Sequence, residues 1–427
     1  MQPRNLLLVG LSLAAAACGS IVNNPDAIRD DACTTCSDAV TTGPVKVVAI
    51  ANSALVANVD VIFQNADDSV VTTLKTDANG AAQATMVAGG SVTVIMPPDP
   101  RSMEQQVFTW VGVKPGDELL TDNKPVVAPA KVPRVFNLPS GGANARYSVE
   151  TECGRISNID TPSVTVQMDQ GCTSSNVYVT VRGPTPRSFY AANVTIPAGV
   201  VDLSTRLYVR SKSIATILTN TPTFVTAATT SASLLDGKLQ MTAPDASTLP
   251  YPAPLSPTTM TTALLPDVAV PDGLYLTNLQ RSSGAAQFFV ERASSDAYTL
   301  DLAVAPLPWL LSEPANDLAG KALVWTESVD GNADVTFLQY TVLRAMPGLR
   351  FSRQIISPYV KNKVRIPQLP PPGEGFNLLA TDTALKLSVQ LAVFPGGFDA
   401  VRAFAFTSGS FADRLSTRGR FGSSAFN

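Results

Sequence analysis

Residues 59–94 read VDVIFQNADDSVVTTLKTDANGAAQATMVAGGSVTV, and this stretch decides the fold. Val59, Val61 and Phe63 recur at every second position, which is the side-chain period of a half-buried strand. Polar turns at 65–68 and 76–80 interrupt the apolar runs, and Gly80 supplies the positive φ that tight turns need. Short strands separated by such turns predict an antiparallel β-sandwich.

The same pattern continues through the rest of the chain. We expect strands at 147–153, 164–168, 177–182, 206–219 and 224–235, and again at 286–292, 298–304, 322–327, 334–344, 385–394 and 400–406. Pro395–Gly397 is typical of a hairpin tip, and no segment predicts a helix of more than two turns. The sequence therefore predicts an all-β protein of tandem antiparallel β-sandwich domains.

One part of the chain resembles a known family. The strand Val59–Phe63, the turn Thr76–Gly80 and the final Gly89-Gly-Ser-Val-Thr-Val94 together resemble the carboxypeptidase-regulatory-like, transthyretin-like β-sandwich. The resemblance covers about residues 44–96, and the remainder resembles no characterised family. It implies a non-catalytic, Ig-like module of the kind found as a spacer or an adhesive unit, and it carries over no active-site residues and no peptidase activity.

Proline-rich stretches suggest where the chain divides. Residues 125–139 hold four prolines and favour an extended, semi-rigid connector, and residues 244–272 hold seven. We therefore expect an Ig-like sandwich at 44–124, a second β domain at 134–244 and a third at 268–427. Before them lie a signal peptide at 1–17 and a polar, Asp-rich tether at 18–43.

The N-terminal sequence predicts the localisation of the protein. Arg4 precedes an apolar run from Leu6 to Ala17, which is shorter than the roughly 20 residues of a membrane-spanning helix but suits a secretory signal. Small residues lead to Cys18, and this arrangement resembles the bacterial lipobox, although Ala15 stands where that motif has leucine. The resemblance implies lipidation of Cys18 and, because Gly19 is not a retention signal, sorting to the outer membrane. The alternative is an ordinary cleaved signal.

Four further cysteines indicate disulfides in an exported chain. Cys153 and Cys172 are flanked by strand-like runs and are the favoured pair among three connectivities. Cys33 and Cys36 favour a small local disulfide, with redox chemistry, cross-pairing and metal binding as alternatives.

Composition excludes several functions. The 427 residues contain no histidine, which removes Ser-His-Asp triads, Cys-His dyads and histidine metal sites. The net charge of −3 offers no basic surplus for nucleic acid. No G-x-S-x-G, S-x-x-K or phosphate-binding glycine motif occurs either. These absences predict a chain without a catalytic site, metal or cofactor.

A few residue groups keep a chemical alternative open. Glu150 and Glu152 share a strand face and are a candidate acid pair, although a solvated face is favoured. Asp330, Asn332 and Asp334 place oxygens as calcium loops do, yet the twelfth position is Thr341 and a plain turn is favoured. The same caution applies to the turn residues Asp67, Asp68, Asp77 and Asn79. Two other sets are candidate contacts: the tryptophans 110, 309 and 325 for sugar stacking, and the arginines 414, 418 and 420 for anionic envelope polymers.

Together these features predict a non-catalytic, lipid-anchored protein of the outer membrane that acts in binding, adhesion or scaffolding. The expected partners are the membrane, through the lipid on Cys18, and glycans or envelope proteins. A carboxylate-dependent hydrolase of polysaccharide is the alternative function, and it requires two carboxyl groups facing each other in a groove.

Overall fold

The structure is a computed structural model, and its contacts divide the chain into residues 1–40 and 41–427. It describes residues 42–99, 102–122, 129–184, 186–237, 239–242, 251–252, 258–268, 272–281, 284–293, 297–303, 307–328, 331–344, 349–402 and 420–426. The predicted signal peptide, Cys18, the tether and the pair Cys33 and Cys36 lie outside these residues. Among the described residues, no helix has the length and apolarity needed to cross a membrane.

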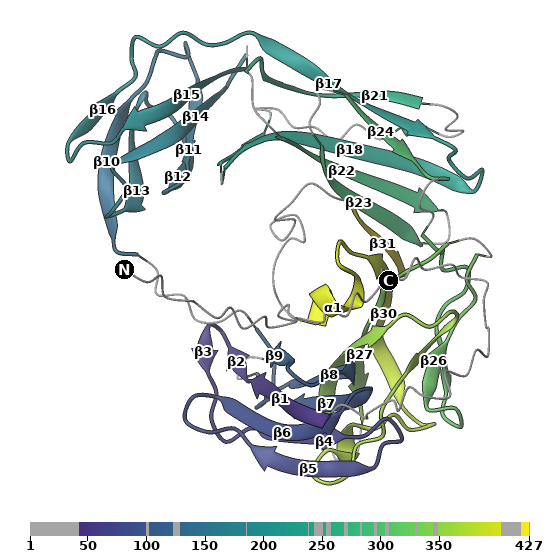
Figure 1. Cartoon of the computed structure of the whole chain (residues 1–427). Coiled ribbons are helices and arrows are strands. Elements are labelled where there is room, and N and C mark those ends of the chain that lie inside the picture. Colours follow the sequence, from purple (N-terminus) through teal and green to yellow (C-terminus); the bar gives the residue numbers. More distant parts are fainter. Residues whose placement is uncertain are drawn as a thin grey trace, which may run out of the picture. The chain divides into compact units, whose positions relative to one another are not determined.

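The described chain is all-β and forms tandem β-sandwiches (Figure 1). The first sandwich places the sheet β6-β1-β9 against the strands β5-β4-β7-β8 around a core that includes Phe63 and Trp110. The bounds are β1 Thr42–Val48, β2 Ile50–Ala51, β3 Ala54–Leu55, β4 Asp60–Gln64, β5 Val70–Lys75, β6 Ala81–Val87, β7 Gly90–Ile95, β8 Gln105–Val113 and β9 Glu118–Leu120. Gly80 has φ +67, and a Cβ there would lie 2.6 Å from the oxygen of Ala49, so this turn requires glycine.

The second sandwich packs the sheet β13-β10-β16 against β12-β11-β14-β15. Its bounds are β10 Lys131–Asn137, β11 Arg146–Thr151, β12 Arg155–Ile159, β13 Ser163–Asp169, β14 Ser174–Arg182, β15 Arg187–Thr195 and β16 Val200–Asp202. The Cys153–Cys172 disulfide, with a Cα–Cα distance of 6.2 Å, joins the turn between β11 and β12 to the loop between β13 and β14 beside this core. Residues 131–137 are a strand and not the expected connector, because β10 finds hydrogen-bonding partners in β13 and β16.

The third sandwich packs the sheet β21-β17-β24 against the strands β19-β18-β22-β23. Its bounds are β17 Ser211–Thr219, β18 Val225–Asp236, β19 Leu239–Thr242, β20 Tyr251–Pro252, β21 Thr258–Pro266, β22 Asp272–Arg281, β23 Ala286–Ala293 and β24 Ala297–Asp301. Strand β21 belongs to the second proline-rich stretch and pairs with β17 over eight residue pairs. Hydrogen bonding therefore crosses the point where the prolines suggested a boundary.

The fourth sandwich covers β27, β28 and β30 with the small sheet β25-β26-β29. Its bounds are β25 Ala315–Asp317, β26 Ala322–Val324, β27 Val335–Leu343, β28 Arg350–Pro358, β29 Lys363–Arg365, β30 Thr383–Val393 and β31 Arg420–Phe426, with a 3-10 turn at Glu374–Phe376 and one helix, α1, at Gly397–Arg402. The strand predicted at 400–406 is wrong for residues 400–402. Gly396 and Gly397 have φ +87 and +65, and the chain turns there into α1, where Arg402 donates to the oxygen of Gly112.

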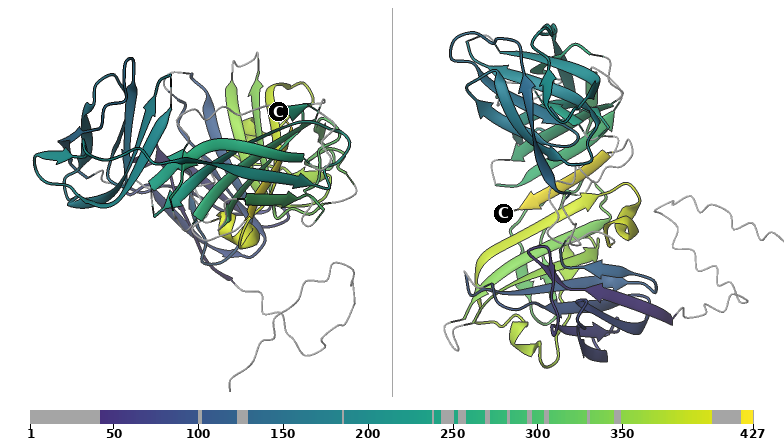
Figure 2. Two further views of the ribbon diagram at one scale, coloured as in Figure 1. Left: turned by 90° about the horizontal axis from the view of Figure 1, so that it is seen from above. Right: turned by 90° about the vertical axis from the view of Figure 1, so that its left-hand side faces the viewer.

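One sheet of thirteen strands runs through several of these sandwiches. Within the part of the chain that the structure describes, its one parallel pair joins β28 to β8, from Phe351–Gln105 to Ile356–Trp110, and so links the last region to the first. The C-terminal strand β31, yellow in Figure 1 and Figure 2, lies between β23 and β30 and pairs antiparallel with both. Strands distant in sequence thus complete each other's sheets.

Candidate functional site

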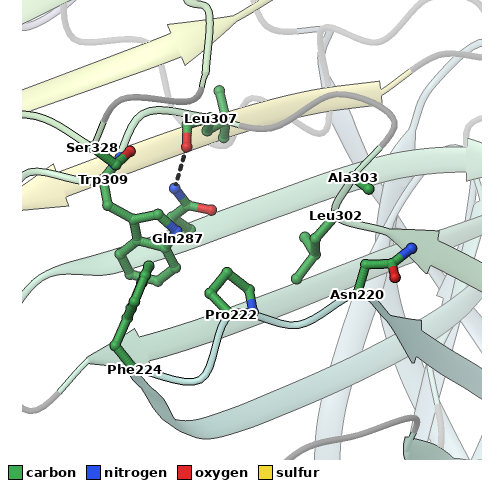
Figure 3. Close-up of a pocket in the computed structure, with 9 residues that line it drawn as sticks. All are labelled: Asn220, Pro222, Phe224, Gln287, Leu302, Ala303, Leu307, Trp309 and Ser328. Atoms are coloured by element: carbon green, nitrogen blue, oxygen red, sulfur yellow. Dashed lines mark hydrogen bonds between the residues drawn. The ribbon is translucent and has the colours of Figure 1, made fainter.

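A pocket in the third sandwich brings together residues from four separate segments (Figure 3). Its volume is about 490 Å³, within the range of small-molecule sites. The lining comes from the turn between β17 and β18, from strand β23, from the loop that follows β24 and from the loop that precedes β27. The residues are Asn220, Pro222, Phe224, Gln287, Leu302, Ala303, Leu307, Trp309 and Ser328.

Two aromatic rings form one wall of the pocket. The rings of Phe224 and Trp309 meet edge to face, with centroids 5.3 Å apart and an interplanar angle of 85°. Phe224 is 36% exposed and Trp309 is 4% exposed, so Phe224 forms the open rim and Trp309 the deeper surface. The guanidinium of Arg281 lies 5.4 Å from the Phe224 centroid and holds that ring by a cation–π contact.

Polar groups lie beside Trp309 in the pocket (Figure 3). Gln287 in β23 is buried and donates from Nε2 to the main-chain oxygen of Leu307 at 3.0 Å, and Figure 3 shows its amide oxygen turned toward the pocket. Ser328 accepts the main-chain N–H of Trp309 on its hydroxyl at 2.9 Å. The amide oxygen of Gln287 is a hydrogen-bond acceptor.

The far end of the pocket begins at Asn220. This residue has φ +53, a left-handed conformation that asparagine tolerates, and it reverses the chain between β17 and β18. Its Nδ2 donates to Asp301 at 2.8 Å, which ties the turn to the end of β24. Pro222 and Leu302 complete an apolar floor between Asn220 and the aromatic rings (Figure 3).

The lining contains amides, a hydroxyl and apolar groups, and no ionisable side chain. A neutral ligand whose ring has a hydrophobic face and hydroxyl groups at its edge complements such a surface. The aromatic side chains of the pocket can pack against the apolar face of the ligand, and the amides can form hydrogen bonds with its hydroxyl groups. The arrangement thus provides for the binding of an uncharged ligand, and its lining holds no carboxyl group.

Of the three tryptophans singled out from the sequence, only Trp309 lines this pocket. Trp110 is fully buried in the core of the first sandwich. Trp325 is 5% exposed and donates from Nε1 to Glu327 at 2.5 Å. Glu327 also accepts the hydroxyl of Tyr359 and the main-chain N–H of Asn362, so this buried carboxylate is held by three donors. Trp110 and Trp325 are therefore core residues.

The expected solvated face of Glu150 and Glu152 is half covered. Strand β19 contacts β11 and β14, and Ser148 on the same face is buried. Burial raises the pKa of Glu150, an effect that the nearby Arg155 opposes. Glu152 remains exposed. Sequence reasoning missed this cover because β19 comes from a segment almost 90 residues further along the chain.

The aspartates of these turns form hydrogen bonds and ion pairs within the fold. Asp77 accepts the main-chain N–H groups of Asn79 and Ala81, and the hydrogen bond from Ala81 lowers the pKa of Asp77. Asp68 pairs with Lys321 and Arg365. Asp334 accepts the main-chain N–H of Phe394 at 3.0 Å.

Several candidates for metal or polymer contacts fall partly or wholly outside the described chain. Asp330, Arg414 and Arg418 lie outside it, and Arg420 begins β31. The described residues hold no group of three acidic or cysteine side chains placed to bind a metal ion.

A second pocket, of about 210 Å³, lies over β27 and β30 and contains one carboxylate, Asp382. Asp382 pairs with Arg344 through two 2.6 Å hydrogen bonds. Burial raises the pKa of the Tyr340 phenol, which also lines this pocket and therefore stays protonated. Neither of these two pockets presents the facing pair of carboxyl groups that glycoside hydrolysis needs.

Gln287, Phe224 and Asn220 were not singled out from the sequence. Gln287 did leave a signal in the sequence, because this amide lies on the same strand face as the apolar Phe289, two residues further along β23. Phe224 and Asn220 left none, because their role depends on the loop that brings Trp309 to β18.

Comparisons with known proteins give no family. No protein-family model matches the sequence, and no curated protein matches it. Among solved structures, the chain is similar to the Bacillus anthracis TIE protein at 10% identity and a TM-score of 0.16, over 61% of this chain and 50% of that one. It is also similar to BcpA, the major pilin subunit of Bacillus cereus, at 10% identity and a TM-score of 0.15, over 61% of this chain and 98% of that one. The chain thus spans about half the length of the Bacillus anthracis protein.

Proposed function

We propose that this chain is a non-catalytic, lipid-anchored protein of the outer membrane that binds a neutral glycan in the pocket between Trp309 and Phe224. The observation that carries the proposal is the composition of that pocket, in which two aromatic rings stand beside two amides and a hydroxyl. Sugars present C–H faces and hydroxyl edges, which are the two kinds of surface that this lining complements. The absence of a charge in the lining favours an uncharged ligand over an acidic one.

A binding titration tests the pocket. Trp309 gives an intrinsic fluorescence signal at the site, so the purified protein is titrated with neutral disaccharides, beginning with the N-acetylglucosamine dimer and glucose and galactose disaccharides. We expect a saturable change in emission. Phe224→Ala should weaken binding about tenfold, which corresponds to about 1.4 kcal/mol.

Phe398→Ala is the matched control. Phe398 is also partly exposed and lies under an arginine, with Arg402 5.0 Å from its centroid, but it does not line the pocket. This variant should bind as the wild type does. The proposed binding function fails if no disaccharide gives a saturable signal, or if Phe224→Ala and Phe398→Ala bind equally well.

The lipid anchor needs a separate test. Cys18→Ala removes the residue that the lipobox resemblance marks for lipidation, so the variant should leave the membrane fraction. If Cys18→Ala stays membrane-bound, the anchor is wrong. Protease treatment of intact cells then reports which side of the outer membrane carries the β-sandwiches, since an outward-facing protein is digested and a periplasmic one is protected.

A further inference from the structure

Tyr340 in β27 is a buried phenol whose hydroxyl group lacks a hydrogen-bond partner. The residue is 1% exposed, and within the part of the chain that the structure describes no group pairs with its oxygen. Burial raises the pKa of the phenol, so the hydroxyl keeps a proton that it can donate. A buried donor without an acceptor is destabilising, and a ligand that supplies the acceptor removes that cost.

Arg353 is a buried cation beside this phenol. It lies directly opposite Tyr340 on β28, is fully buried, and forms no ion pair with the residues that the structure describes. Its Nε donates to Thr109 Oγ1 at 3.2 Å, and its Nη2 donates to the main-chain oxygen of Pro367 at 2.9 Å. These two nitrogens share one edge of the planar guanidinium, which leaves Nη1 without a partner. The guanidinium also lowers the pKa that burial raises in Tyr340, so its charge acts on the hydroxyl.

The pocket of about 210 Å³ over β27 and β30 adjoins Tyr340. Tyr340 lines it together with Leu387, which lies directly opposite Tyr340 on β30. Leu323, Val342 and Leu378 extend the apolar wall that Leu387 begins. The volume admits a molecule with a single ring, since apolar cavities of about 150 Å³ hold benzene. An apolar pocket thus lies next to a donor that lacks an acceptor.

The charges around this pocket favour an anion. Asp382 is the one carboxylate of the lining, and both of its oxygens accept hydrogen bonds from Arg344. That pair is neutral as a whole, so Arg353 leaves a net positive charge beside Tyr340. A buried charge without a counter-ion is costly, and a ligand of opposite charge is therefore stabilised there.

We propose that this pocket binds a small apolar carboxylate, whose carboxylate group accepts a hydrogen bond from the Tyr340 hydroxyl and whose ring or short alkyl chain packs against Leu387 and Val342. A carboxylate supplies the acceptor that Tyr340 lacks and the negative charge that Arg353 lacks. Arg353 is a positioning residue here, because it acts on the ligand through its charge and through Tyr340. The site shares no lining residue with the pocket at Trp309, so it does not depend on glycan binding there.

Calorimetric titration of the full chain tests the class of ligand. The probes are benzoate and hexanoate, and each is compared with its neutral counterpart, benzyl alcohol or hexanol. We expect at least one carboxylate to bind with a Kd below about 1 mM, and to bind at least about tenfold more tightly than its alcohol. The proposal is overturned if neither carboxylate binds with a Kd below about 1 mM, or if the alcohols bind as tightly as the carboxylates.

Tyr340→Phe tests the location of the site, because it removes the hydroxyl and keeps the ring. Carboxylate binding should weaken at least about tenfold. The midpoint of thermal unfolding should stay the same or rise, since the hydroxyl has no hydrogen-bond partner to lose. Tyr147→Phe is the matched control, because Tyr147 is also buried but belongs to the core of the second sandwich, and it should bind the carboxylate as the wild type does. Equal affinity of Tyr340→Phe and the wild type overturns the assignment.

Discussion

Gln287 and Leu307 are joined by a buried hydrogen bond of 3.0 Å between the Gln287 amide and the Leu307 main-chain oxygen. This bond fixes the loop that leads to Trp309 against β23 and so gives the pocket its shape. Gln287→Leu leaves the Leu307 oxygen buried without its donor, and we expect a loss of about 1–3 kcal/mol in the free energy of unfolding. Urea titration measures the loss. Gln280→Leu, at an exposed position of β22, should change stability little, and equal effects would contradict this role for Gln287.

Gly422 in β31 packs against the same loop. A Cβ at this position would lie 2.7 Å from Leu307 Cδ1 and 3.3 Å from the Phe289 ring. Gly422→Ala should therefore destabilise the protein by about 1–3 kcal/mol, through overpacking at the centre of the sheet. Gly171→Ala is the control, because a Cβ at Gly171 has no atom within 4 Å. Thermal unfolding compares the two variants. An unchanged midpoint temperature for Gly422→Ala would show that the loop at Leu307 moves to accommodate the added methyl group.

The Cys153–Cys172 disulfide closes a loop with a sequence separation of 19. Replacement of both cysteines by serine should cost about 3 kcal/mol, because the unfolded chain regains the freedom that the cross-link removes. Urea unfolding with and without reductant measures this cost. Reductant should destabilise the wild type and leave the stability of the double variant unchanged. If reductant does not change the stability of the wild type, the result argues against the disulfide.

Asp382 predicts a dependence of stability on acid pH. Burial raises its pKa, but the hydrogen bonds from Arg344 and from the Leu379 main chain outweigh burial, and the pKa is lowered overall. An unfolded aspartate titrates near pH 3.9, so the unfolded state binds the proton first as the pH falls. The stabilisation is therefore present above about pH 5 and is lost as the pH falls through the folded pKa.

Asp382→Asn isolates this contribution. At pH 7 it should cost about 3 kcal/mol, because it leaves Arg344 largely buried without its counter-ion, and the gap to the wild type should narrow below pH 4. Asp160→Asn breaks an exposed pair with Arg146 and should cost less than about 1 kcal/mol. If the difference in the free energy of unfolding between Asp382→Asn and the wild type does not change with pH, the dependence of stability on pH does not come from Asp382.

The sequence by itself determined the strands and several turns. Alternation placed β4, β7 and β30 closely, since a strand with one buried face must repeat every second residue. It also marked Gly80, since only glycine fits that turn, and it named the cysteine pair that the structure joins. These features depend on neighbours within a few residues, or on chemistry that one residue type carries.

Tertiary structure alone decided which strands share a sheet and where the pocket lies. Residue alternation specifies a face and not a partner, so the pairing of β28 with β8, and of β31 with β23 and β30, had no signal in the pattern. The helix at Gly397–Arg402 replaced an expected strand because a contact with Gly112, some 290 residues away, holds Arg402. Trp309 became a site residue, while Trp110 and Trp325 became core, for the same reason. A side chain's exposure is set by the segments that fold over it, and those segments lie far away in the chain.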